Sequence, residues 1–189
     1  MSPVTYLIIV VVGFAAVYFI VPPVVGTYLK YRGKRIVTCP ETKESVAIDV
    51  DATHATFTAA LGKPELRLKD CTRWPEREDC GQECLLQVEA WPDECLVATI
   101  VKEWYAGKKC VFCGIEFAED HWFEHKPALL GIDGRTIEWP DVLPELLPEV
   151  LANHKPVCWN CHVAETFRRE HPELVVDRTY SKQANVGSR

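Results

Sequence analysis

The N-terminal apolar run from Pro3 to Gly26 contains no charged side chain, and it constrains this chain more than any other feature. A helix needs roughly 20 predominantly apolar residues to cross the hydrocarbon core of a bilayer, and the run meets that length. No basic residue precedes it and no small-x-small cleavage pattern follows it, so an uncleaved anchor is favoured over a signal peptide. We therefore expect a single transmembrane helix followed by a soluble head.

Basic residues cluster immediately after the apolar run, whereas the residues before it carry no side-chain charge. Cytoplasmic flanks of membrane-spanning helices are enriched in Lys and Arg, so this bias predicts a single-pass protein with its N-terminus outside and its C-terminal domain in the cytoplasm. We also expect Pro22 and Pro23 to bend or end the helix near the headgroups. The basic residues that set the orientation are Lys30, Arg32, Lys34 and Arg35.

Hydrophobic periodicity predicts a few short elements in the head. The clearest is a helix over Pro92–Tyr105, with Pro in its first turn, apolar residues at helical spacing and Gly107 as its stop. The other expected elements are a β-hairpin over Arg35–Val50, a strand at Glu65–Lys69, and helices at Gln82–Ala90, Asp141–Asn153 and Val163–Glu170.

Two Cys-x-x-Cys pairs lie in the C-terminal half of the chain, and Gly114 directly follows the first pair. Four thiolates in two such pairs form a closed tetrahedral site of the kind that structural zinc occupies. The turn that brings two sulfurs onto one ion needs a positive φ, which glycine adopts at no steric cost. We predict that one zinc ion is bound by Cys110, Cys113, Cys158 and Cys161.

A knuckle with the first pair, a long excursion, and the second pair before a predicted helix together resemble the treble-clef zinc finger over residues 107–175. Within this segment, Asn153 stands in an N-x4-C-x2-C-H pattern that is similar to the tail of zinc-bearing HNH nuclease motifs. Glu124-His125-Lys126-Pro127 falls in the interval of that family's first motif. The HNH resemblance implies His125 as general base and Asn153 as its orienting partner.

The charge balance argues against nucleic-acid binding. The chain has 21 Lys and Arg against 27 Asp and Glu, a net charge of −6, and no long basic run. Acidic residues also outnumber basic ones between Gly107 and Val175, so DNA would meet a repulsive surface. We therefore expect a structural zinc finger rather than a nuclease, and no nucleic-acid partner.

The segment Cys158–His162 also fits the Cys-x-x-Cys-His pattern of c-type haem attachment, in which His162 would be the axial ligand. The only methionine is Met1, so the second axial ligand would have to be a histidine such as His154 or His171. Haem attachment takes place outside the cytoplasm and gives the first cysteine pair no role. Zinc is favoured, and haem c or an iron–sulfur centre are the alternatives.

Five further cysteines precede the paired motifs. Their irregular spacing leaves two interpretations open: a second four-thiolate site, or separate cysteines in an apolar core. Cys95 begins an apolar helix and is expected to be a buried free thiol. Thiols stay reduced in the cytoplasm, so we expect one zinc ion or two. The ligands of the second site would be Cys39, Cys71, Cys80 and Cys84.

The chain contains no Ser-His-Asp pattern, glycine-rich phosphate loop or His-Glu-x-x-His helix. We expect a membrane-anchored zinc-binding interaction or assembly module, an accessory subunit that meets the lipid bilayer and a membrane-protein partner. An enzyme is disfavoured, because only the HNH resemblance supports one. The alternative is an electron-transfer protein with haem or iron–sulfur. The expected fold is one transmembrane helix plus a small α+β metal-stapled soluble domain. Its predicted parts are an anchor at 1–29, an α+β subdomain at 30–106, a treble-clef-like zinc domain at 107–178 and a mobile tail at 179–189.

Overall fold

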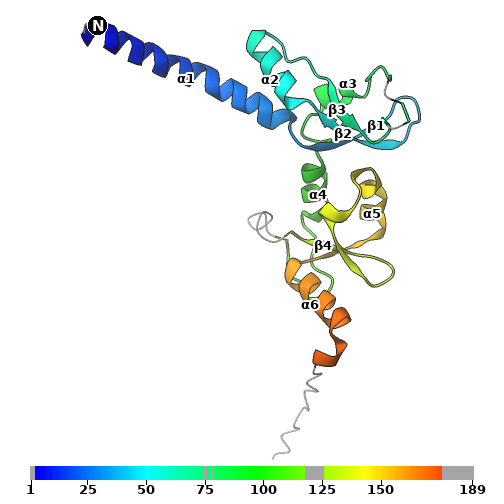
Figure 1. The fold of residues 1–189 in the computed structure, drawn as a ribbon. Coiled ribbons are helices and arrows are strands. Elements are labelled where there is room, and N and C mark those ends of the chain that lie inside the picture. Colours follow the sequence, from blue (N-terminus) through cyan, green and yellow to red (C-terminus); the bar gives the residue numbers. More distant parts are fainter. Residues whose placement is uncertain (1–2, 75, 78, 118–125, 176–189) are drawn as a thin grey trace, which may run out of the picture. The chain divides into compact units, whose positions relative to one another are not determined.

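The computed structural model of the chain describes residues 3–74, 76–77, 79–117 and 126–175. It divides into two compact units, one built from Met1–Ala106 and Pro140–Ala152 and the other from Gly107–Trp139 and Asn153–Arg189. Each unit contains a three-stranded sheet together with helices, so the part of the chain that follows α1 is α+β (Figure 1). The predicted tail at 179–189 lies outside the described residues.

Helix α1 (Pro3–Tyr31) is the long apolar element that the sequence predicted, and by length and composition it is able to cross a membrane. Its side chains are exposed along most of its length. The helix does not end at Pro22 and Pro23, which both lie inside it. Each proline removes one intrahelical hydrogen bond, but the bonds formed by the neighbouring turns keep the helix continuous.

The predicted hairpin is confirmed by β1 (Lys34–Thr38) and β2 (Ser45–Val50), which pair antiparallel. Strand β3 (Leu68–Cys71) pairs with the other edge of β2 and begins later than the strand predicted at Glu65–Lys69. The sheet order is therefore β1-β2-β3. Helix α3 (Leu85–Ala90) contributes to the same core. The core side chains of the strands and α3 are Val37, Val46, Ile48, Val50, Leu68, Cys71, Leu85 and Val88.

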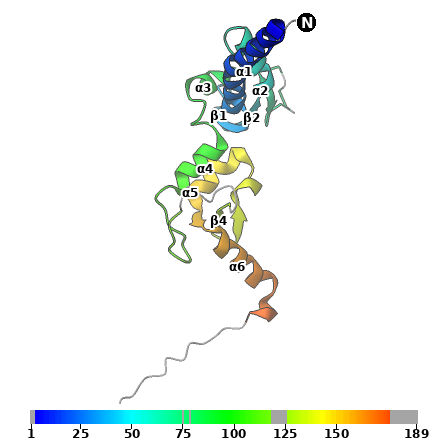
Figure 2. The same ribbon diagram turned by 90° about the vertical axis from the view of Figure 1, so that its left-hand side faces the viewer.

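Helix α2 (Ala52–Leu61) was not predicted from the sequence. It lies beside the C-terminal part of α1 in both views (Figures 1 and 2). A pocket between the two helices is lined by Phe19 and Pro23 from α1 and by Ala59 and Ala60 from α2. Ala52 and Ala55 of α2 are buried in the core of the unit, and packing against α1 covers a further part of the helix.

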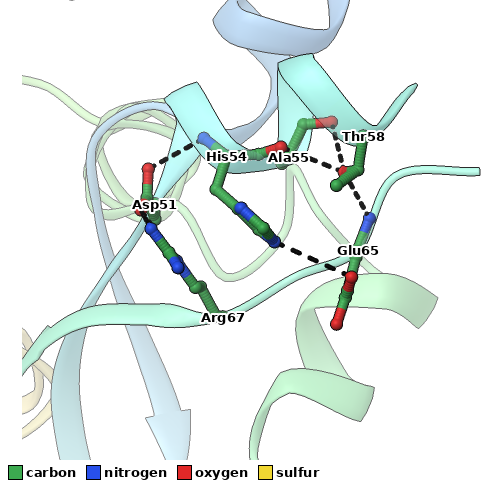
Figure 3. A network of polar contacts seen from close by, with 6 residues as sticks. All are labelled: Asp51, His54, Ala55, Thr58, Glu65 and Arg67. Carbon is green, nitrogen blue, oxygen red and sulfur yellow. Dashed lines mark hydrogen bonds and ion pairs between the residues drawn. The ribbon is translucent and has the colours of Figure 1, made fainter. Parts of the chain in front are cut away.

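A network of polar contacts fixes both ends of α2 (Figure 3). Asp51 caps its N-terminus, since one carboxylate oxygen accepts a 2.9 Å hydrogen bond from the backbone N–H of His54. The other oxygen accepts two hydrogen bonds from Arg67, at 2.9 Å from Nε and 2.6 Å from Nη2. Farther along the helix, the hydroxyl oxygen of Thr58 accepts a 2.8 Å hydrogen bond from the backbone N–H of Glu65. The helix is therefore tied to the segment that leads into β3.

Helices α4 (Val97–Tyr105) and α5 (Leu147–Asn153) both begin later than the sequence predicted. Residues 92–95 form turns, and Leu96 makes a β-bridge to Arg35 that keeps its backbone extended, so α4 starts only after it. The helix expected from Asp141 begins instead with two short 3-10 turns, η2 (Trp139–Asp141) and η3 (Pro144–Leu146).

The second unit contains a sheet of three short strands, β4 (Ala128–Leu130), β5 (Thr136–Glu138) and β6 (Lys155–Val157). Both β5 and β6 pair antiparallel with β4, in the order β5-β4-β6. Helix α6 (Trp159–Glu170) follows β6 directly and is succeeded by the turn η4 (Pro172–Leu174). The buried side chains Ala128, Val157 and Cys110 form one cluster. A predicted metal ligand is therefore part of this small core.

Candidate metal centre

The structure brings the two Cys-x-x-Cys pairs together in the second unit. The Sγ atoms of Cys110, Cys113, Cys158 and Cys161 all lie within 4.8 Å of one another, and those of Cys113 and Cys158 are 3.6 Å apart. Four sulfurs at about 2.3 Å from a tetrahedral zinc ion stand about 3.8 Å from each other. Within the described part of the chain, this is the one group of His, Cys, Asp or Glu ligand atoms with such spacing. The cluster is able to hold a metal ion.

A tight turn positions the first pair. The backbone N–H of Cys110 donates to the carbonyl oxygen of Ile115 at 2.9 Å, and the N–H of Gly114 donates back to the carbonyl oxygen of Cys110 at 2.9 Å. Gly114 has a φ of +73°, as the sequence analysis expected for this position. A β-bridge between Lys109 and Glu116 closes the base of the turn. Both thiols thus project from one compact loop.

The end of β6 and the start of α6 position the second pair. The N–H of Val111 donates to the carbonyl oxygen of Pro156 at 3.1 Å, which joins the first turn to β6. Cys158 is the N-cap residue of α6, and Cys161 lies in its first turn. The helix begins at Trp159 rather than at the predicted Val163, so the helix N-terminus with its partial positive charge lies at the sulfur cluster.

Backbone N–H groups favour the thiolate form of Cys110. Burial disfavours its thiolate, but hydrogen bonds from the N–H groups of Cys158, Cys113 and Phe112 outweigh that cost and lower the pKa of Cys110 to about 6. The N–H of Cys158 lies 3.3 Å from the Cys110 sulfur. Burial, followed by the neighbouring thiols, raises the pKa of Cys161. A bound cation would stabilise all four sulfurs as thiolates.

Four thiolates are enough to complete the tetrahedral coordination sphere of a bound ion, with no further ligand required. Zinc sites that act catalytically keep one position for water or substrate, whereas sites with four protein thiolates are structural. The chemistry available to this arrangement is therefore to join the turn at Cys110 to the start of α6 and so to stabilise the unit.

Of the residues that the haem and HNH patterns single out, His162 and Asn153 lie in the described part of the chain and His125 does not. Nδ1 of His162 lies 2.8 Å from Oγ1 of Thr136, and its Nε2 lies 3.8 Å from a carboxylate oxygen of Glu138. These two partners on β5 carried no sequence signal, because only the pairing of β5 with β4 brings them near α6. Asn153 ends α5. Glu124 and His125 of the HNH-like first motif lie outside the described residues, whereas Lys126 and Pro127 directly precede β4.

The cysteines of the expected second site lie around one pocket in the first unit. Cys39, Cys71, Cys80 and Cys84 line one pocket. Their sulfurs are not drawn together as closely as those of the first cluster, the single group among the described residues whose ligand atoms all approach within 4.8 Å.

Comparison with protein-family models, with curated proteins and with solved structures found no match for this chain.

Proposed function

We propose that this chain is a membrane-anchored zinc-binding interaction module, an accessory subunit that docks on a membrane-protein partner. One observation carries the proposal: four thiols from two distant segments converge within 4.8 Å. Four thiolates at this spacing would repel one another, and a bound cation would offset that repulsion. The zinc ligands are Cys110, Cys113, Cys158 and Cys161.

The order of elements around the cluster supports a treble-clef arrangement. A turn carries Cys110 and Cys113, the β4-β5 hairpin follows, and β6 leads into a helix whose first turn carries the second pair. A metal-binding turn followed later by a cysteine pair at the start of a helix is the order that the resemblance to a treble-clef zinc finger implies. A structural zinc ion then supplies much of the folding free energy of a unit with so small a core.

Zinc is favoured over haem by the surroundings of His162. Its Nδ1 lies within hydrogen-bond distance of Thr136, and its Nε2 faces the carboxylate of Glu138, so neither nitrogen projects into open space. The sulfurs of Cys158 and Cys161 lie near those of the first cysteine pair. Thioether bonds to a haem would prevent them from binding a metal ion together with that pair.

Exposed apolar side chains support the membrane anchor. Val, Ile, Leu and Phe side chains are exposed along the length of α1. Such a surface favours a lipid environment for the helix. On the neighbouring α2, Phe57 is 66% exposed and Leu61 is 77% exposed. Both suit the membrane interface beside the end of the span. The basic flank from Lys30 to Arg35 favours a cytoplasmic head and an N-terminus outside.

Further apolar side chains are exposed around the zinc ligands. Val111, Phe112 and Ile115 are exposed on the turn of the first pair, and Val163 and Phe167 lie one helical turn apart on α6. Exposed apolar side chains that gather in one small unit are typical of a protein-binding surface. A zinc ion with four protein ligands would hold in place the backbone that carries these exposed side chains.

Photo-crosslinking in native membranes tests the docking role. A crosslinker at Phe112 is expected to give a discrete adduct with a membrane protein, and Cys113→Ser is expected to abolish that adduct. Ile132 is 96% exposed in the same unit and serves as the matched position for non-specific capture. Equal adducts from Phe112 and Ile132, or none from Phe112, would refute the docking role.

A further inference from the structure

We propose that Cys39, Cys71, Cys80 and Cys84 are the ligands of a second thiolate metal centre, located in the first unit. All four side chains line the same pocket of about 230 Å³, although they come from separate segments of the sequence. This inference goes beyond the proposed function, because it concerns a different unit and does not depend on the first cluster holding zinc.

The backbone around Cys39 repeats that of the first metal-binding turn. The N–H of Cys39 donates to the carbonyl oxygen of Glu44 at 2.9 Å, and the N–H of Lys43 donates back to the carbonyl oxygen of Cys39 at 2.9 Å. Cys110, Ile115 and Gly114 make the same two bonds at the same sequence separations. The two turns therefore have one hydrogen-bonding pattern.

The backbone angles and the sulfur contacts extend this equivalence. Lys43 has a φ of +62°, a left-handed conformation that is rare for a non-glycine residue, at the position where Gly114 has +73°. The Cys39 sulfur accepts hydrogen bonds from the N–H groups two and three residues ahead, those of Glu41 and Thr42. In the first turn the N–H groups of Phe112 and Cys113 do the same for Cys110. Thr42 stands where the first turn has its second cysteine, so this turn contributes one ligand.

The other three cysteines are held around the same pocket by secondary structure. Cys71 is the last residue of β3 and pairs with Ile48, while Cys84 directly precedes α3, and both are buried. The side-chain oxygen of Gln82 accepts a 2.9 Å hydrogen bond from the N–H of Leu68, which fixes the loop carrying Cys80 against β3.

An arginine also lies within hydrogen-bond distance of one proposed ligand, Cys39. Nη1 of Arg73 lies 3.0 Å from the Cys39 sulfur and 3.3 Å from a carboxylate oxygen of Glu41. Hydrogen bonds from N–H groups to ligand sulfurs are a general feature of thiolate metal sites, since they disperse the negative charge of the cluster.

The chemistry that four thiolates share is affinity for a thiophilic metal, either a single zinc ion or an iron–sulfur cluster. A zinc ion requires the four side chains to turn inward to the spacing seen in the first cluster, whereas an iron–sulfur cluster accepts more widely spaced sulfurs. Metal analysis distinguishes the two.

The test is the metal content of the purified full-length chain, measured as zinc, iron and acid-labile sulfide. We expect Cys80→Ser to lose one zinc ion, or all iron and sulfide, relative to the unmodified chain. Cys95→Ser is the matched control, because Cys95 lies outside the pocket and its bond to the carbonyl oxygen of Trp91 is one that a serine hydroxyl also makes. Unchanged metal in a folded Cys80→Ser chain would overturn the proposal. Loss of metal from Cys80→Ser but not from Cys113→Ser would instead remove the proposed function and leave this inference standing.

A second measurement needs no variant. The rate at which Cys80 is alkylated in the native chain is expected to rise at least tenfold after a chelator removes the metal, while the rate at Cys95 stays constant. Equal rates at Cys80 before and after the chelator would mean that it holds no metal.

Discussion

Arg35 donates a 2.8 Å hydrogen bond from Nη1 to the carbonyl oxygen of Tyr31, in the last turn of α1. The same guanidinium group also reaches the carbonyl oxygens of Gly33 and Lys30, and its side chain is completely buried. The last carbonyl groups of a helix lack intrahelical partners, and a cation there interacts favourably with the helix dipole. A strand residue thus caps the apolar helix and joins it directly to the first sheet.

Replacing Arg35 with Met is expected to destabilise the first unit by roughly 2–4 kcal/mol, because several buried carbonyl groups lose their donor. Denaturant unfolding of the full chain in detergent measures the change. Arg32→Met is the matched control, since Arg32 is exposed in the neighbouring turn. Equal stability of the two variants would contradict a capping role for Arg35.

Replacing Gly114 with Ala is expected to weaken zinc binding by roughly tenfold, because the left-handed conformation costs an L-residue about 1–2 kcal/mol. The cost is conformational, since a Cβ at Gly114 would meet no atom within 4 Å. Gly114→Asn is expected to bind more tightly than Gly114→Ala, because asparagine tolerates this conformation. Competition with a chromophoric chelator measures both affinities, and equal affinity of Gly114→Ala and the unmodified chain would exclude the strained turn.

Asp51 is expected to make the stability of α2 depend on pH. The N–H of His54, and then the guanidinium of Arg67, lower the pKa of Asp51 in the folded chain. A lowered pKa means that the stabilisation is complete above the ordinary carboxylate pKa of about 3.9 and is lost as the pH falls through the lower folded value. A carboxylate oxygen of Glu65 lies 3.8 Å from Nε2 of His54, so Glu65 is a second acidic group close to this end of the helix. Hydrogen exchange of the α2 amides should show this loss.

Asp51→Asn is the control for that experiment, because it keeps an N-cap acceptor and removes the charge. We expect the native chain to exceed Asp51→Asn in α2 protection at neutral pH, and the two to converge in acid. Asp51→Ala should lose about 1 kcal/mol at neutral pH by losing the cap as well. A constant gap between the native chain and Asp51→Asn at all pH values would rule out the ionised carboxylate as the cause.

The proposed orientation predicts which cysteines an impermeant maleimide reaches on intact cells. All nine native cysteines follow the apolar run, so a cytoplasmic head leaves the native chain unlabelled until the cells are permeabilised. Ser2→Cys places a thiol on the outer side and is expected to be labelled on intact cells. Labelling of the native chain before permeabilisation would reverse the topology.

Local patterns predicted the parts of the fold that they determine. Period-two alternation predicted the hairpin of β1 and β2, and the two Cys-x-x-Cys pairs predicted the cluster that now includes Cys110 and Cys158. The strands β4, β5 and β6 are only three residues each, too short to produce a periodic signal. They form because they pair with each other beside the cysteine cluster.

Helix α2 shows why other parts were missed. Its sequence is rich in Ala and Thr and has no apolar stripe, so periodicity did not reveal it. Its stability comes from contact with α1 and from Asp51, whose role as N-cap depends on the path of the backbone. The similarity between the turns at Cys39 and Cys110 was hidden for a related reason, since Lys43 occupies the left-handed position that Gly114 occupies in the other turn.

The most direct test of the account is the metal content and absorption spectrum of the purified full-length chain. Two zinc ions per chain, or one zinc ion with an iron–sulfur cluster, are expected, with no Soret band and with loss of one zinc ion on Cys113→Ser. Covalently bound haem with a Soret band, or a folded chain whose zinc content is unaffected by Cys113→Ser, would contradict it.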